Sequence, residues 1–283
     1  MNDKLKITVS MALFGTLSLF IRNIPLTSAE VALLRAVIAL ACLLSWQGLR
    51  RQPVKLRGMG RDLPLLFLSG AAMGFNWIFL FEAYKYTTVS VATLSYYFAP
   101  MIVMLLCPVL FRERMTKKQV LCFAGSTAGL VLVINVGRLT EGGDHVKGVA
   151  FGLAAAALYA SVILMNKGIR RVGGIDRTVL QFAGAAIVLL PYVLSTTGIS
   201  FAAMTPLGWA CLLCVGALHS GVAYVLYFSS LRTLPGQEAA ILSYIDPVVA
   251  VVVSVAVLRE PVTAAQLAGG AMILAFTLIN ELK

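Results

Sequence analysis

Long apolar runs separated by short polar segments repeat along the whole 283-residue chain. A helix needs about 20 apolar residues to cross the hydrocarbon core of a bilayer. Ten runs approach or exceed that length, at about residues 6–22, 28–47, 63–82, 88–111, 118–136, 148–166, 177–196, 206–228, 236–258 and 262–281. Hydrophobic residues make up 59% of the chain and charged residues 12%. The pattern predicts an all-α integral membrane protein with ten transmembrane helices.

One of these runs occurs twice, as Tyr96–Gln119 and again as Ser243–Gln266. Each copy contains a proline and ends in an Arg-Glu pair. The matched positions are Tyr97 and Tyr244, Pro100 and Pro247, Arg112 and Arg259, Glu113 and Glu260, Thr116 and Thr263, and Gln119 and Gln266. An internal repeat in a membrane protein points to a site at the interface of its copies. We therefore predict two five-helix repeats, residues 1–137 (spans 1–5) and residues 147–283 (spans 6–10), around a central cavity.

The basic residues predict the orientation of these spans. With a cytoplasmic N-terminus, 17 of the 23 Lys and Arg residues fall on the inner side and five on the outer side, as the positive-inside rule requires. Both termini are then cytoplasmic, and the protein is a multi-pass protein of the inner or plasma membrane. Five spans per repeat is an odd number, so the second repeat is inverted relative to the first. The net charge of +11 is explained by these loops and does not indicate a nucleic-acid partner.

Arg35 within VALLRAVIAL, the paired spans that each close with Arg-Glu, and the two five-span halves resemble the drug/metabolite transporter superfamily, and more narrowly its EamA-type members. The resemblance implies alternating access around a cavity lined mainly by spans 1, 3, 4, 6, 8 and 9. Members of the superfamily often export amino acids or related metabolites, and some import small cationic compounds. The second repeat of many members reads Glu-Pro, whereas this chain has Asp246-Pro247.

Ionisable residues inside a span are costly and usually face a cavity or a partner. Asp246 in span 9 and His219 in span 8 are the candidates for proton coupling or substrate binding, because histidine titrates near neutral pH. The alternative is a structural hydrogen bond that locks the two spans together. Arg35 in span 2 either holds a substrate carboxylate or serves as a structural counter-ion. Glu82 in span 3 is a further candidate for proton coupling.

Polar and aromatic side chains on spans 3, 4 and 8 complete the predicted substrate site. The predicted substrate-binding residues are Asn76, Trp77, Thr93, Tyr97, His219, Tyr224 and Asp246. Trp77 with Tyr84, and Glu82 nearby, form either part of a cation-binding cage or part of an aromatic belt at the membrane interface. Pro100 and Pro247 are the predicted hinges, because proline removes a backbone donor from a helix.

The chain contains no H-E-x-x-H, G-x-S-x-G or P-loop motif, so we expect neither an enzyme nor an ATP-driven pump, and neither a metal nor a cofactor. The expected function is secondary transport of a small organic metabolite, with export of an amino acid or related zwitterion as the leading hypothesis. The alternative is proton-coupled or facilitative import of a cationic or quaternary-amine compound, and a membrane-embedded enzyme is the alternative of a different class. The expected partners are the substrate, the lipid bilayer and protons as candidate coupling ion, and the sequence leaves the oligomeric state open.

Overall fold

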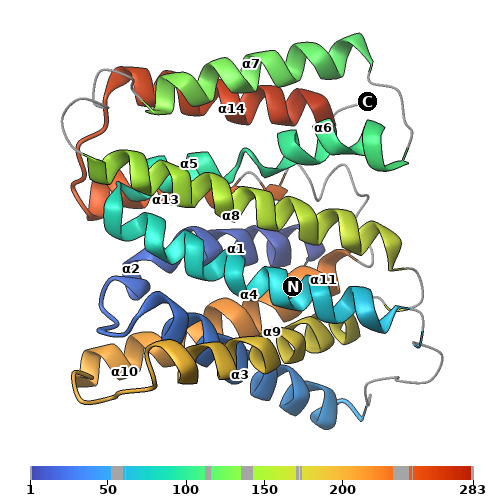
Figure 1. Cartoon of the computed structure of the whole chain (residues 1–283), viewed down its shortest axis with the longest axis vertical. Coiled ribbons are helices and arrows are strands. Elements are labelled where there is room, and N and C mark those ends of the chain that lie inside the picture. The colour runs from blue at the N-terminus through green and yellow to red at the C-terminus, as the bar shows by residue number, and fades with distance from the viewer. Residues whose placement is uncertain are drawn as a thin grey trace.

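A computed structural model describes residues 2–51, 60, 62–111, 116–134, 143–169, 172, 174–231, 242–243 and 245–281. The regular elements in these ranges are helices that lie side by side with roughly parallel axes (Figure 1). The first half contains α1 (Asp3–Gly15), α2 (Leu17–Ile21), α3 (Ser28–Leu49), α4 (Leu63–Tyr86), α5 (Val89–Tyr96), α6 (Ala99–Phe111) and α7 (Lys117–Ile134). The second half contains α8 (Gly143–Gly168), α9 (Gly174–Thr196), α10 (Pro206–Leu213), the π-helical η2 (Cys214–Val222), α11 (Ala223–Leu231), α13 (Ile245–Val252), the π-helical η3 (Val253–Val257) and α14 (Ala264–Glu281).

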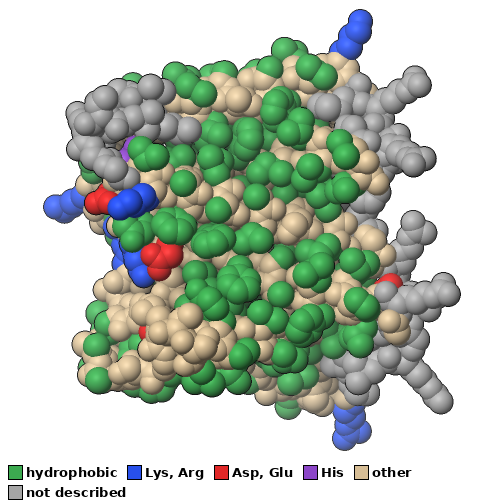
Figure 2. Space-filling model, viewed as in Figure 1, with side chains coloured by type: hydrophobic (Ala, Val, Ile, Leu, Met, Phe, Trp, Pro, Cys, Tyr) green, Lys and Arg blue, Asp and Glu red, His purple; other side chains and the backbone are tan. Residues whose placement is uncertain are grey.

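The helices have the length and composition of membrane spans. Seven helical stretches in the described ranges are long and apolar enough to cross a bilayer, namely Asp3–Ile21, Ser28–Leu49, Leu63–Tyr86, Val89–Leu106, Asp144–Asn166, Gly174–Thr196 and Pro206–Tyr227. Two shorter apolar helices, Ile245–Val257 and Ala264–Asn280, lie in runs that were also predicted to span. Hydrophobic side chains cover much of the visible face, and the described charged ones lie at its edges (Figure 2). The all-helical fold is confirmed for the described residues, and the count of ten spans stays a prediction.

Two corresponding helices, α7 and α14, begin with the same pair of hydrogen bonds. The amide of Thr116 donates to Oε1 of Gln119 at 2.8 Å, and the amide of Gln119 donates to Oγ1 of Thr116 at 3.2 Å. The amide of Thr263 donates to Oε1 of Gln266 at 3.0 Å, and the amide of Gln266 donates back to Oγ1 of Thr263 at 3.2 Å. Such a capping box satisfies two amides that a helix start leaves without partners. These residues occupy matched positions in the duplicated segment, so both copies carry the same helix-start signal.

Helices α7 and α14 pack against each other at one edge of the bundle, at the top of Figure 1. Glycines allow this close approach. A Cβ atom added to Gly269 would lie 2.4 Å from the carbonyl oxygen of Gly129, and one added to Gly125 would lie 2.3 Å from the ring of Phe276. At Gly129 and Gly269 the two backbones therefore lie in direct contact.

The rest of the bundle is also built from contacts between the two halves. Helix α4 packs on α8 and α9, α3 packs on α9 and η2, and α1 packs on α11 and α13. The largest core cluster includes Phe81 of α4 and Phe182 of α9, both fully or almost fully buried. The interface between the halves is therefore the interior of the molecule.

Several spans contain a break or a π-helical turn. Thr16 separates α1 from α2, Tyr97 and Phe98 separate α5 from α6, and π-helical turns form η2 and η3. Pro100 lies in the first turn of α6 and Pro247 in the first turn of α13, where a helix tolerates proline because the amide there needs no intrahelical partner. Irregular backbone at membrane depth is tolerated where it is buried or lines a cavity.

Candidate functional site

A cavity of about 330 Å³ lies between the two halves, and we call it the central cavity. It is lined by Met11, Phe14, Gly15, Leu17, Arg35, Trp77, Leu80, Tyr84, Thr93, Tyr96, Tyr97, Ala99, Pro100, Tyr159, Ile163, Tyr224, Tyr227, Ser243, Asp246 and Ala250. These residues come from the first span (α1 and α2) and from α3, α4, the α5/α6 break, α8, α11 and the start of α13. Its size suits a small organic molecule.

Asp246 supplies the one carboxylate among the lining residues. The hydroxyl of Tyr97 donates a hydrogen bond of 2.7 Å to Oδ2 of Asp246. Tyr97 lies at the α5/α6 break of the first half, and Asp246 lies in the first turn of α13 of the second half. The bond thus joins the two halves across the cavity, and the second carboxylate oxygen stays available to a cationic ligand.

Aromatic rings cover much of the cavity wall. The rings of Tyr96 and Tyr159 lie 5.3 Å apart, and those of Tyr96 and Tyr97 meet edge to face at 5.9 Å. The ring of Phe14 meets that of Tyr224 edge to face at 5.2 Å. Ring faces attract organic cations and ring bodies bury apolar surface, so this wall can hold the apolar body and the charged nitrogen of one ligand.

The cavity also contains a cation. Arg35 of α3 is 3% exposed, and its guanidinium carbon lies 4.6 Å from the ring centre of Trp77. Its Nε donates to Oγ of Ser220 at 2.6 Å. A single cavity therefore combines one carboxylate, one guanidinium and an aromatic wall.

His219 does not bond to Asp246, so the predicted structural hydrogen bond between spans 8 and 9 is wrong. The His219 side chain is fully buried, with Nε2 at 3.1 Å from Oγ1 of Thr16 and Nδ1 at 3.1 Å from the carbonyl oxygen of Cys214. Its ring packs edge to face on Phe20. The π-helical turn of η2 directs His219 toward the α1/α2 break, and the residue is not among those that line the central cavity.

Two further predicted residues also lie outside the cavity lining. Asn76 is 2% exposed and donates through Nδ2 to the carbonyl oxygen of Ala155 at 2.6 Å, so it joins α4 to α8. Glu82 pairs with Lys85 one turn along α4, at 2.9 Å and exposed to solvent. Glu82 therefore does not contribute to a cation cage, whereas Trp77 and Tyr84, the aromatic residues predicted with it, both line the cavity.

Comparison with known proteins identifies the family of this chain. The sequence pattern of the EamA-like transporter family matches residues 5–135 and again residues 146–281. The chain belongs to the EamA-like transporter family. It is 31% identical over 277 residues to an uncharacterized transporter of Archaeoglobus fulgidus, covering 96% of this chain and 94% of that one. It is 29% identical over 253 residues to the uncharacterized transporter YxxF of Bacillus subtilis, covering 88% and 79%.

Further relatives agree with this assignment. Protein PecM of Dickeya dadantii is 27% identical over 237 residues, which covers 79% of this chain and 77% of that protein. A solved protein structure superimposes with a TM-score of 0.63 at 21% identity and covers 98% of this chain and 96% of that one, so the two share a fold. As an EamA-like transporter of the drug/metabolite transporter superfamily, the protein is a multi-pass membrane protein. Family membership indicates transport rather than catalysis.

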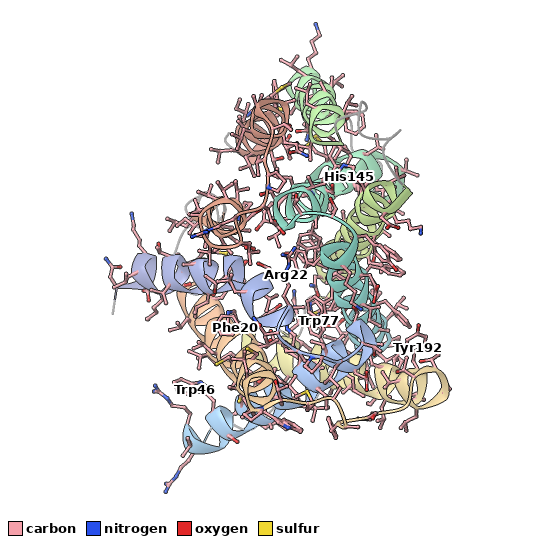
Figure 3. All side chains as sticks on the ribbon, turned by 90° about the vertical axis from the view of Figure 1, so that its left-hand side faces the viewer. Phe20, Arg22, Trp46, Trp77, His145 and Tyr192 are labelled. Carbon is pink, nitrogen blue, oxygen red and sulfur yellow. The ribbon has the colours of Figure 1, made fainter. Side chains whose placement is uncertain are left out.

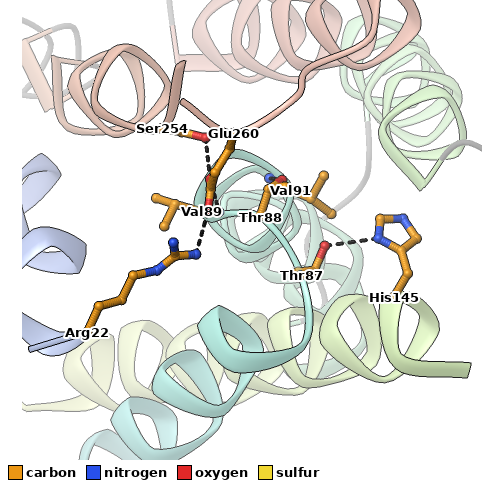
Figure 4. A network of polar contacts seen from close by, with 8 residues as sticks. All are labelled: Arg22, Thr87, Thr88, Val89, Val91, His145, Ser254 and Glu260. Atoms are coloured by element: carbon orange, nitrogen blue, oxygen red, sulfur yellow. Dashed lines mark hydrogen bonds and ion pairs between the residues drawn. The ribbon is translucent and has the colours of Figure 1, made fainter. Parts of the chain in front are cut away.

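The described residues of this EamA-like chain also form a network of polar contacts at the end of the bundle where α2 ends and α5 begins. We call this end of the bundle the Arg22 end. Viewed from this end, Arg22 and Trp77 lie toward the middle of the bundle, and Trp46 and Tyr192 lie at its edge (Figure 3). Arg22 forms an ion pair with Glu260, one of the matched residues of the duplicated segment. Glu260 also accepts from the amide of Val89 at 2.8 Å and from Oγ of Ser254 (Figure 4). One carboxylate therefore holds spans 1, 4 and 9 together.

Sequence reasoning missed Tyr159 as a cavity residue and Glu260 as the centre of a network. Tyr159 lies one helical turn after Ala155, whose carbonyl oxygen binds Asn76, and this spacing would place both on the face of α8 toward α4. The matching Arg-Glu pairs of the duplicated segment were the available signal for Glu260. Arg112 and Glu113, the corresponding pair of the first copy, lie outside the described residues.

Proposed function

We propose that the protein is a secondary transporter that moves a small organic metabolite across the cytoplasmic membrane by alternating access. The observation that carries this proposal is the central cavity, which both halves line and in which Tyr97 of one half holds Asp246 of the other. A site at the interface of two halves can be exposed to either side when the halves move relative to each other.

The proposed mechanism needs two inverted five-helix repeats in the ranges 1–137 and 147–283, and three observations support them. The family pattern matches twice, once in each range. Contacts between the halves come in corresponding pairs, since α4 packs on α8 as α1 packs on α11, and α4 packs on α9 as α3 packs on η2. The basic residues favour cytoplasmic termini and opposite orientations of the two halves.

The breaks within the spans are the proposed points at which the helices bend during transport. Breaks at Thr16 and at Tyr97–Phe98, and the π-helical turns η2 and η3, lie in spans that border the cavity. Pro100 and Pro247 are the proposed hinges, because each lies in the first turn of a helix that borders the cavity. The Arg22–Glu260 network would hold the Arg22 end closed, and the charge pattern makes this the outer end.

The proposed substrate is an amino acid or a related zwitterion, and the direction is export, as in many members of the superfamily. Asp246 would bind the ammonium group, and Trp77, Thr93, Tyr97 and Tyr224 would contact the rest of the molecule. The second candidate, import of a quaternary amine, is favoured by the tyrosine-rich wall and by the position of Asp246 in it. A membrane-embedded enzyme has no supporting observation.

Protons are the proposed coupling ion, and Asp246 and His219 are their candidate carriers. Asp246 would alternate between a proton and the cationic nitrogen of the substrate, because a desolvated carboxylate favours a neutral pair. His219 lies outside the cavity and would act through Thr16 rather than by contact with the substrate.

A binding screen followed by transport tests this proposal. Purified protein is heated with amino acids, polyamines or quaternary amines, since a ligand raises the melting temperature by mass action. Compounds that stabilise it are then assayed for counterflow in proteoliposomes with the wild type and with Asp246→Asn, with and without a pH gradient. We expect amino acids to bind and Asp246→Asn to abolish counterflow. Stabilisation by quaternary amines alone would select the second candidate, and equal counterflow by both proteins would overturn the site.

A further inference from the structure

Arg35 is a buried cation with few protein partners. Its side chain is 3% exposed and lies against the ring of Trp77, at 4.6 Å, and that of Phe81, at 5.8 Å. Its one hydrogen bond to a described residue runs from Nε to Ser220. No carboxylate of the described residues forms an ion pair with it. Among the described residues, Nη1 and Nη2 therefore have no hydrogen-bond acceptor, and Arg35 lines the central cavity.

A second arginine of the same chain, which is partly buried, shows what a structural arginine looks like here. Arg177 of α9 donates from Nε and Nη2 to the carbonyl oxygen of Val172, at 3.0 and 2.7 Å. It also donates from Nη2 to Ile169 at 2.8 Å and from Nη1 to Asn166 at 3.4 Å. All three of its nitrogens are satisfied by backbone, and it does not line the cavity. Arg35 differs from it on both counts.

Leaving the guanidinium nitrogens of Arg35 without acceptors costs free energy. A charged side chain at membrane depth is unfavourable unless a partner compensates it, and a cation–π contact with Trp77 replaces only part of the lost hydration. The guanidinium fork fits a carboxylate with two parallel hydrogen bonds. A ligand carboxylate would satisfy the free donors of Arg35 and neutralise its charge.

We infer that Arg35 is the binding site for the carboxylate of a zwitterionic substrate, with Asp246 binding the ammonium group of the same molecule. This inference rests on the proposed transport function and narrows its substrate class to molecules that carry both charges. Tyr84, Tyr96 and Tyr224 interact electrostatically with the guanidinium and line the same cavity. Their rings would bury the apolar part of the ligand.

Matched ligands test the inference. Purified wild-type protein is screened by isothermal titration against the common amino acids, and each binder is compared with the amine that lacks its carboxylate, such as phenylalanine with phenethylamine. We expect the wild type to prefer the amino acid. In Arg35→Gln, affinity for the amino acid should fall roughly tenfold or more, to the level of the amine, because bonds between charged groups are lost. Affinity for the amine should change by less than about twofold, since the amine never reaches Arg35.

Two further variants separate binding from folding. Arg177→Gln should lower the melting temperature and leave the preference for amino acids intact, because Arg177 is structural. Arg35→Lys keeps a positive charge, so it should retain part of the preference even if Arg35→Gln does not fold. Equal loss for both ligands in Arg35→Gln, no loss for either, or a wild type without preference would each overturn the carboxylate site. Binding of amines alone would overturn it and leave the proposed transport function standing.

Discussion

The hydroxyl of Thr16 lies between two acceptors, at 2.8 Å from the carbonyl oxygen of Leu13 and at 3.1 Å from Nε2 of His219. The other ring nitrogen of His219 faces the carbonyl oxygen of Cys214, which can only accept, so the geometry assigns a proton to Nδ1. In a neutral ring Nε2 then needs the single proton of Thr16, which Leu13 also uses. A proton on Nε2 would turn this nitrogen into a donor, which would no longer compete with Leu13 for the proton of Thr16. The protonation of His219 is therefore linked to the break between α1 and α2.

Thr16→Val removes this hydroxyl at nearly constant volume. It leaves Nε2 of a fully buried histidine without a partner, so the free energy of unfolding should fall by about 1–3 kcal/mol. Thermal melting of the purified protein measures the loss. Thr16→Ser keeps the hydroxyl and should melt close to the wild type, and equal melting of Thr16→Val and Thr16→Ser would rule out this role.

Tyr97→Phe removes the donor that orients Asp246. Because a hydrogen bond to a charged group contributes about 1.5–3 kcal/mol, binding of a cationic or zwitterionic ligand should weaken roughly tenfold. Isothermal titration checks this value. In an Asp246→Asn background the same change should cost much less, since the two residues act as one unit. Tyr86→Phe is the control, because Tyr86 stacks on Phe151 outside the cavity lining. Additive losses of affinity from Tyr97→Phe and Asp246→Asn would contradict the coupling.

Glu260→Gln should loosen the Arg22 end. It removes the ion pair with Arg22 and weakens the bond to the amide of Val89, the first residue of α5. A cysteine in place of the cavity residue Tyr84 should then react at least roughly fivefold faster with an impermeant thiol reagent added at that side, the change that about 1 kcal/mol produces.

The matched control for this experiment is Glu82→Gln. Glu82 is also a carboxylate near the Arg22 end, but its ion pair stays within one helix, where such pairs contribute little. Labelling should therefore not change. A Glu260→Gln protein that labels no faster than the Glu82→Gln protein would show that the network does not hold this end closed.

The contact between α7 and α14 makes a prediction about stability. Gly269→Ala would push a methyl group to within 2.4 Å of the Gly129 carbonyl oxygen, so the helices must separate and the melting temperature should drop by several degrees. Gly48→Ala is the control, because nothing lies within 4 Å of that position in α3. There, alanine should stabilise the helix by roughly 0.5–1 kcal/mol. If both variants melt alike, close backbone packing does not hold this pair together.

Much of the cavity wall could be predicted because spacing along one helix determines which side chains share a face. Thr93 and Tyr97, four residues apart in span 4, were both predicted to bind substrate, and both line the cavity. The capping boxes at Thr116 and Thr263 follow from sequence as well, since they need only residues three apart.

Relations between spans could not be read from the sequence. The similar depth of His219 and Asp246 in their membrane spans suggested that they meet. The π-helical turn of η2 changes the direction in which His219 points. The partner of Arg35 is Ser220, 185 residues away, and no periodicity connects the two. Helix order and rotation are set by packing, which a pattern of apolar positions leaves open.

The bond between Tyr97 and Asp246 has a consequence for the resting state. In the duplicated segment their counterparts are Tyr244 and Ala99, and alanine offers no acceptor. If the two halves exchange roles during transport, the opposite conformation lacks an equivalent bond, which is a difference of about 1.5 kcal/mol or more. That difference corresponds to a population ratio of roughly ten to one. An empty carrier of this design waits mostly on one side of the membrane, in the conformation in which Tyr97 holds Asp246.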